Sequence, residues 1–248
     1  MDDKNFVVLG IPRSGTKFFC KSLNERPNIW VPSWNSTYEP FNLKRIEHSS
    51  EIFKSHLFDH NNIVKKLISA KKDQQKAYMG FKTFLIWHRD FKDVIEQNQL
   101  RIIIVIRKNF WKVFGSFLMS IENADYTGSS KRFSPFLFCP SNRENRRIID
   151  IFNNFCYQYW QLENDYSSHK NLIDKIYFED FTQSTKFEKL NDYFDDRIHF
   201  QNDYNDLDSV KTYFANFEQL KSFVVEHCRS APKHYGALPD YFLENLGL

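Results

Sequence analysis

Apolar positions along the chain fall into short runs and into longer stripes with helical spacing. The runs cover residues 6–9, 77–82, 102–106 and 175–178. Ile102–Ile106 is entirely β-branched, which is typical of a parallel strand covered on both faces. Apolar residues repeating every three or four positions predict helices over residues 17–24, 60–68, 91–98, 110–120, 142–166, 186–194 and 217–224. This alternation predicts an α/β fold with a mostly parallel central sheet flanked by helices.

The stretches between these elements are predicted to be irregular. Residues 29–42 are rich in Pro and aromatic side chains, which predicts a loop that covers a pocket. Residues at about 121–141 combine Gly, Pro and Ser and are interpreted as a lid-like insertion. Ser209 is expected to cap a helix through Tyr213, within a C-terminal helical part at about 209–248. No linker composition divides the chain, so residues 1–248 are predicted to form a single domain.

Composition narrows the class of protein further. A hydrophobic content of 42% with 26 Phe supports a sizeable core, and a net charge of +3 is too small to predict nucleic-acid binding. The four cysteines form no CxxC pair, so neither a zinc site nor a disulfide framework is indicated. The first strand begins by Phe6, which leaves no room for a signal peptide, and no apolar run approaches the ~20 residues of a membrane helix. We therefore expect a cytoplasmic protein without a membrane span, whose oligomeric state stays open.

The segment Gly10–Lys17 follows directly on the first apolar run. Pro and Gly between a strand and a helix place backbone N–H groups at a helix N-terminus, where they can bind a phosphate. An ordinary turn between strand and helix is the alternative. A Walker A loop needs Lys immediately after its last Gly, whereas Thr16 follows Gly15 and Lys17 comes one place late.

Three cations follow, or come near the end of, three predicted strands. Arg13, Lys82 and Arg107 are expected at the carboxyl edge of the sheet, where ligands of such folds bind. Together they predict a pocket for a multiply anionic ligand. Nucleotide triphosphatases need a magnesium-binding Asp after the second strand, but the run 102–106 ends in Arg107 and Lys108. The sequence therefore favours phosphate binding without a metal.

Two motifs resemble the sulfotransferase family that uses 3′-phosphoadenosine 5′-phosphosulfate. Pro12–Phe19 is similar to that family's 5′-phosphosulfate loop, in the Arg-Ser-Gly-Thr form of carbohydrate- and tyrosine-directed members. The resemblance implies a P-loop-like sulfotransferase fold and nucleotide contacts from Arg13, Ser14, Gly15, Thr16, Lys17 and Phe18.

In that family, the second motif holds the 3′-phosphate. It is an apolar strand that ends in Arg, with a Ser about two helical turns later. Arg107 and Ser116 resemble this pair. The usual spacing would place the Ser at Gly115, so either Lys108 takes the place of the Arg or the turn carries an extra residue. We prefer Arg107 with Ser116 and keep Lys108 as the alternative.

Weaker similarities supply the remaining site residues. Lys82 lies in a Lys-Thr segment similar to the one that precedes the catalytic His of cytosolic members, but Phe84 stands where that His would be. In carbohydrate-directed bacterial relatives a Glu after the first helix is the base, and Glu39 resembles it; His88 is the rival base. Phe178 precedes Glu-Asp at a predicted strand end, which the resemblance makes an adenine neighbour.

The resemblance implies transfer of a sulfuryl group from 3′-phosphoadenosine 5′-phosphosulfate to a hydroxyl of a carbohydrate or glycan-like acceptor, without a metal. The other product is adenosine 3′,5′-bisphosphate. Arg13 would stabilise charge on the bridging oxygen, Lys82 would neutralise the transferring group and Glu39 would accept the proton. Two alternatives remain: a divergent P-loop nucleotide kinase, and a non-catalytic nucleotide- or glycan-binding module without a base. The sequence leaves the acceptor and the position of sulfation open.

Overall fold

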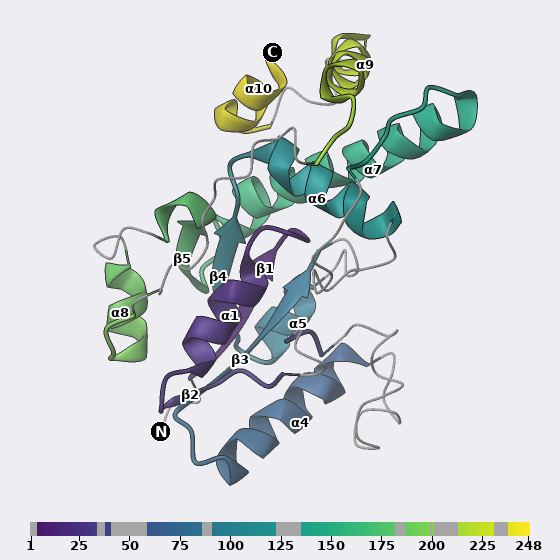
Figure 1. Ribbon diagram of the computed structural model, residues 1–248. Coiled ribbons are helices and arrows are strands. Elements are labelled where there is room, and N and C mark those ends of the chain that lie inside the picture. Colours follow the sequence, from purple (N-terminus) through teal and green to yellow (C-terminus); the bar gives the residue numbers. More distant parts are fainter. Residues whose placement is uncertain are drawn as a thin grey trace.

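The computed structural model describes residues 4–33, 38–40, 59–85, 91–122, 135–181, 187–198, 200, 213–230 and 238–248. Its centre is a sheet of five strands, all parallel, in the order β2-β3-β1-β4-β5 (Figure 1). The strands are β1 (Lys4–Gly10), β2 (Ile29–Trp30), β3 (Tyr78–Phe84), β4 (Arg101–Ile106) and β5 (Leu172–Tyr177). The predicted α/β architecture with a parallel central sheet is confirmed.

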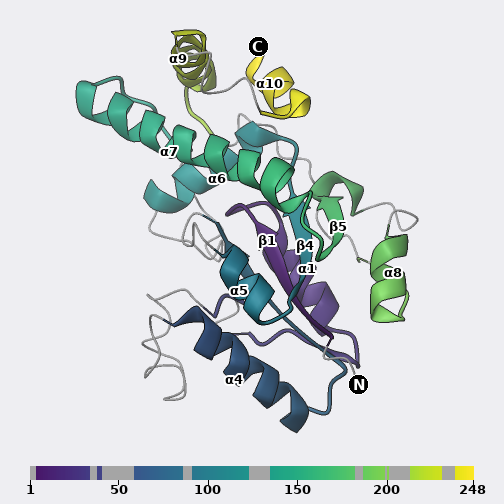
Figure 2. The same cartoon turned by 180° about the vertical axis from the view of Figure 1, so that it is seen from behind.

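Helices cover both faces of this sheet. The α-helices of the described residues are α1 (Thr16–Asn24), α4 (His60–Asp73), α5 (Lys92–Gln97), α6 (Phe110–Glu122), α7 (Asn142–Trp160), α8 (Glu188–Phe194), α9 (Phe217–Ser230) and α10 (Asp240–Leu246). Figure 1 shows α1 and α8 on the near face, and Figure 2, seen from behind, shows α4, α5 and α7 on the other. In both views α9 and α10 lie at one end of the molecule, beyond α6 and α7.

The core has two parts, one on each side of the sheet. Phe6 and Val8 of β1 pack on the α1 side, whereas Val7 and Leu9 pack on the opposite side. The residues of Ile102–Ile106 divide in the same alternating way, and all five are fully buried. Because successive side chains of a strand point to opposite faces, a strand covered on both sides needs apolar residues at every position. This explains the unbroken apolar runs in the sequence.

Several predicted boundaries differ from the structure. The segment 29–42, predicted as a loop, begins with the edge strand β2, because Ile29 and Trp30 pair with β3; residues 34–37 and 41–42 lie outside the described part. The helix predicted over 142–166 is α-helical to Trp160 and then continues as the π-helix Gln161–Tyr166. Strand β5 ends at Tyr177, and the 3₁₀ turn Phe178–Asp180 follows it.

The predicted lid and C-terminal part are also corrected in detail. Within 121–141, residues 121–122 complete α6 and residues 123–134 lie outside the described part. Phe136 forms a parallel bridge with Phe214, since its amide donates to the Tyr213 carbonyl at 2.9 Å. Tyr213 is therefore in a turn beside this bridge and not in the predicted helix, whose cap Ser209 is outside the described residues. The terminal helix α10 was not predicted as a separate element.

Candidate functional site

The loop between β1 and α1 is tight and partly left-handed. Gly15, the N-cap of α1, has a φ of 90° and Arg13 has a φ of 72°, a region that few non-glycine residues adopt. Ser14 is fully buried, and its hydroxyl donates to the Val105 carbonyl of β4 at 3.2 Å. A Cβ on Gly10 would lie only 2.4 Å from the methyl carbon of Thr16. Small residues therefore let the loop close against the sheet.

This loop presents the positive end of α1. Gly15 has no side chain, and no side-chain hydrogen bond caps the helix from that position. The first amides of a helix lack intrahelical acceptors and attract anions. The Lys17 side chain is exposed, whereas Arg13 is half-buried and its Nε donates to Ser116 Oγ of α6 at 2.8 Å. Arg13 is therefore the cation of the loop that is fixed against α6.

The turn between β4 and α6 separates Arg107 from Lys108. Arg107 is only 5% exposed, and its guanidinium carbon lies 5.0 Å from the centre of the Phe178 ring. Phe178 also borders the loop between β1 and α1, because a Cβ on Gly15 would come within 2.1 Å of its ring. Lys108 is exposed and lies over the Tyr177 ring instead, at 4.2 Å. Arg107, and not Lys108, therefore shares its ring neighbour with Gly15.

Two residues from distant parts of the chain hold this turn. The Tyr159 hydroxyl of α7 donates to the Arg107 carbonyl at 2.8 Å. The Glu179 carboxylate accepts hydrogen bonds from the amides of Lys108 and Asn109, at 3.1 and 3.2 Å. Burial, reinforced by the Glu179 charge, raises the pKa of Tyr159, so this side chain stays a hydroxyl donor. The sequence interpretation missed both roles: Tyr159 belongs to an apolar stripe, and Glu179 was noticed only as part of a strand end.

The structure brings Glu39 and Lys82 together. The Glu39 carboxylate and the Lys82 ammonium lie 2.8 Å apart, with side chains 11% and 4% exposed. The Lys82 amide also donates to the Tyr38 carbonyl at 2.9 Å, which holds residues 38–40 against β3. Cys20 of α1 lies near enough to respond to both charges, and burial raises its pKa to about 12. This cysteine therefore stays a thiol and is not a nucleophile of the site.

The ion pair and the Arg107 turn mark two separate positions along the sheet. Lys82 pairs in register with Val8, whereas Val105 pairs with Gly10. Ile106 therefore stands three positions, or about 10 Å, further along the sheet than Lys82, and two strands, or about 10 Å, across it. The loop that begins α1 follows β1, the strand between them. A ligand that contacts both positions must be extended and carry charge at separated points.

The switch point between β1 and β4 has the topology expected of a ligand site. Strand β1 connects through α1 to β2 on one side, and β4 connects through α6 and α7 to β5 on the other. Ligands of open α/β sheets bind at the carboxyl ends of strands where the connections reverse in this way. The loop after β1 and the Arg107 turn both follow strands that border this switch point.

Other features of the described residues bear less directly on the site. His88 lies outside them. No group of three or more His, Cys, Asp and Glu side chains gathers there in a way that would hold a metal ion. A surface hollow lies between β5 and α8, and none of the predicted site residues lines it. None of the described helices is long and apolar enough to cross a membrane.

Comparison with known proteins adds no family. No protein-family profile matches the chain, and no curated protein is significantly similar to it.

Proposed function

We propose that the protein is a sulfotransferase that moves a sulfuryl group from 3′-phosphoadenosine 5′-phosphosulfate to a hydroxyl of a carbohydrate or glycan-like acceptor. The observation that carries the proposal is the buried Arg107. It shares its Phe178 neighbour with Gly15 of the loop between β1 and α1, the candidate phosphate loop. A buried cation at the end of β4 suits a second anionic group of the ligand. A magnesium-dependent kinase would need a carboxylate there.

The two turns suit the two ends of this nucleotide. The first amides of α1 and the Arg13 guanidinium would hold the 5′-phosphosulfate, while Arg107 would hold the 3′-phosphate. Phe178 borders both turns, and Phe18 is half-buried against other aromatic rings, with a centroid distance of 5.7 Å to Phe181. These rings offer apolar surface to the adenine base.

The nucleotide supplies the sulfuryl group, and the chain's own residues position it and handle the charges. As the bond from sulfur to the phosphate oxygen breaks and the bond to the acceptor oxygen forms, negative charge develops on the phosphate oxygen, which Arg13 stabilises. The Lys82 ammonium offsets the charge of the transferring group. Glu39, 2.8 Å from Lys82, accepts the acceptor's proton. Cytoplasmic localisation remains part of the proposal.

Nucleotide binding and group transfer test the proposal together. Titration calorimetry with adenosine 3′,5′-bisphosphate should show binding that does not depend on magnesium. Incubation with the ³⁵S-labelled donor and a panel of glycans should label one acceptor class. Binding of ATP with magnesium, without binding of the bisphosphate, would instead support the kinase alternative and contradict the proposal.

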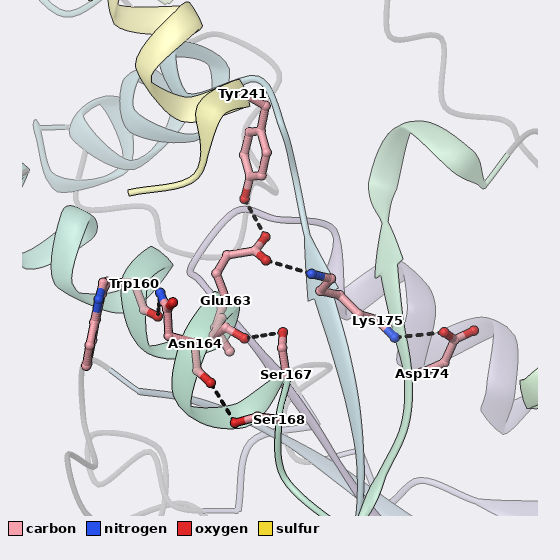
Figure 3. A network of polar contacts seen from close by, with 9 residues as sticks. Trp160, Glu163, Asn164, Ser167, Ser168, Asp174, Lys175 and Tyr241 are labelled. Carbon is pink, nitrogen blue, oxygen red and sulfur yellow. Dashed lines mark hydrogen bonds and ion pairs between the residues drawn. The ribbon is translucent and has the colours of Figure 1, made fainter. Parts of the chain in front are cut away.

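The base is tested by Glu39→Gln, which keeps the size of the side chain but removes its proton affinity. Loss of a positioned general base should lower turnover by about 10² to 10⁴, with binding of the bisphosphate unchanged. Glu163→Gln is the matched control, because Glu163 is 10% exposed, pairs with Lys175 at 2.7 Å (Figure 3) and is not one of the predicted site residues. A wild-type protein that binds the nucleotide but transfers no label would indicate the non-catalytic module.

A further inference from the structure

We infer that Tyr159 is a positioning residue that sets the protein's preference for a 3′-phosphorylated nucleotide by holding the backbone of Arg107. The inference rests on the proposed function, in which Arg107 binds the 3′-phosphate. Tyr159 lies 52 residues further along the chain and is fully buried, so it acts through Arg107 and does not touch the ligand.

The hydrogen bond from Tyr159 lies just beyond the end of the sheet. Pairing between β4 and β5 ends at Ile106 and Tyr177, so the Arg107 carbonyl follows the last paired residue. The Tyr159 hydroxyl donates to this carbonyl at 2.8 Å. It thereby fixes the backbone at the point where the strand gives way to the turn.

The Tyr159 ring has little freedom to move. Its centroid lies 4.8 Å from that of Phe242, which is fully buried in α10, and 6.3 Å from that of Phe110 at the start of α6. Phe242 and Phe110 also contact each other, at 4.7 Å. The hydroxyl is therefore aimed at Arg107 by packing from α6 and α10.

Glu179 holds the same turn as a hydrogen-bond acceptor, whereas Tyr159 holds it as a donor. It accepts from the amides of Lys108 and Asn109, while Tyr159 donates to the carbonyl of Arg107. Three consecutive residues thus have a backbone group fixed by a side chain from another element. Because charge-assisted hydrogen bonds to a phosphate depend on geometry, a small shift of this backbone would misplace the Arg107 guanidinium.

The test compares two nucleotides on Tyr159→Phe. We expect affinity for adenosine 3′,5′-bisphosphate to fall about fivefold to tenfold, as for the loss of one hydrogen bond. Affinity for adenosine 5′-phosphate, which lacks the 3′-phosphate, should stay within about twofold. Tyr193→Phe on α8 is the matched control and should change neither, because Tyr193 packs against Tyr78 and Phe194, away from the turn.

A double-mutant cycle separates positioning from a general loss of stability. In an Arg107→Ala background, Tyr159→Phe should cause no further loss of bisphosphate affinity. An equal loss for both nucleotides, or a loss that persists without Arg107, would overturn the inference.

Hydrogen exchange on the nucleotide-free protein provides a readout that does not depend on the proposed function. Tyr159→Phe should speed exchange of the Lys108 and Asn109 amides while leaving that of Ile104 in β4 unchanged. Unchanged exchange at Lys108 and Asn109 would overturn the inference. If the wild type binds neither nucleotide, the proposed function fails, and exchange still decides whether Tyr159 holds the turn.

Discussion

The turn after β1 and the turn after β4 are held in different ways. The loop after β1 takes its shape from left-handed backbone at Gly15 and Arg13, and its own side chains bond outward, Ser14 to the Val105 carbonyl of β4 and Arg13 to Ser116 of α6. The turn after β4 is held by Tyr159 and Glu179, which lie 52 and about 70 residues further along the chain. The first turn thus depends on residues of its own, through their backbone conformation and their side-chain bonds, whereas the second depends on side chains that other elements supply.

This difference predicts where each turn is vulnerable. The loop after β1 should be most sensitive to substitution of its glycines, because a Cβ at Gly10 or Gly15 would clash with a neighbouring side chain. The second should be sensitive to side chains that are remote in sequence. Each of the following substitutions separates these two kinds of dependence.

The largest effect is expected from Gly15→Ala. The substitution places a Cβ at a φ of 90° and within 2.1 Å of the Phe178 ring. Backbone strain and overpacking together should lower the free energy of unfolding by about 3 kcal/mol, measured by urea denaturation.

Gly247→Ala is the control for the backbone term alone. Gly247 has a φ of 77°, but no atom lies within 4 Å of the Cβ position. This variant should lose only about 1 kcal/mol. Equal losses at the two glycines would show that the contact between Gly15 and Phe178 contributes nothing to the sensitivity of the loop.

The next effect separates the two cations of the second turn. Arg107→Ala should weaken binding of adenosine 3′,5′-bisphosphate by about 10- to 100-fold, because a charge-assisted hydrogen bond to a buried site is lost. Lys108→Ala should change it less than about threefold, since Lys108 is exposed over Tyr177. The reverse order, measured by calorimetry, would assign the 3′-phosphate to Lys108.

The sequence predicted the first turn better than the second for the same physical reason. Pro and Gly between a strand and a helix are local signals, so the loop from Gly10 to Lys17 was recognised from its own residues. The sequence favours Arg107 but keeps Lys108 as the alternative, because the spacing to Ser116 carries one extra residue and neighbouring residues at a strand end point to opposite faces. Arg107 continues the alternation of Ile103 and Val105 toward α1, which only the fold reveals.

Other parts were predicted as residues but not as contacts. Glu39 and Lys82 were both selected, but their ion pair depends on the hydrogen bond that brings residues 38–40 onto β3. The edge strand β2 has only two residues, and pairing with β3, not its own pattern, makes it a strand. Helix α10 has seven residues and buries Phe242 and Leu246, too short a stripe to stand out in the sequence.

A smaller effect is expected where α10 contacts the π-helix. The Tyr241 hydroxyl donates to Glu163 at 2.8 Å, and Glu163 also pairs with Lys175 (Figure 3). Tyr241→Phe should lower the free energy of unfolding by about 1 kcal/mol, measured by urea denaturation, because one hydrogen bond is lost and the ion pair remains. The ratio of affinities for the two adenosine nucleotides should not change. A changed ratio would mean that the second turn depends on the polar anchor of α10 as well as on Tyr159.

The smallest effect concerns β5, the strand that leads to Phe178 and Glu179. Asp174 pairs in register with Ile103 of β4, and burial raises its pKa above the ordinary value of 3.8. A carboxyl group whose pKa is raised by folding destabilises the folded state when it ionises, so its unfavourable contribution to stability appears as the pH rises from the unfolded pKa through the higher folded pKa. Asp174→Asn should therefore increase the free energy of unfolding at pH 7. The variant should lose this advantage near pH 3, where the protonated Asp174 of the wild type is neutral like the amide.

Urea denaturation of the wild type and Asp174→Asn at the two pH values measures this difference. The amide oxygen of Asn keeps an acceptor for the Lys175 amide, which donates to Asp174 at 2.9 Å, so the comparison isolates the charge. A stabilised β5 should also slow exchange of the Lys108 amide, which Glu179 binds, while leaving the Ser14 amide of the first turn unaffected. If both turns changed alike, the distinction between a loop held by its own residues and a turn held by side chains from other elements would be wrong.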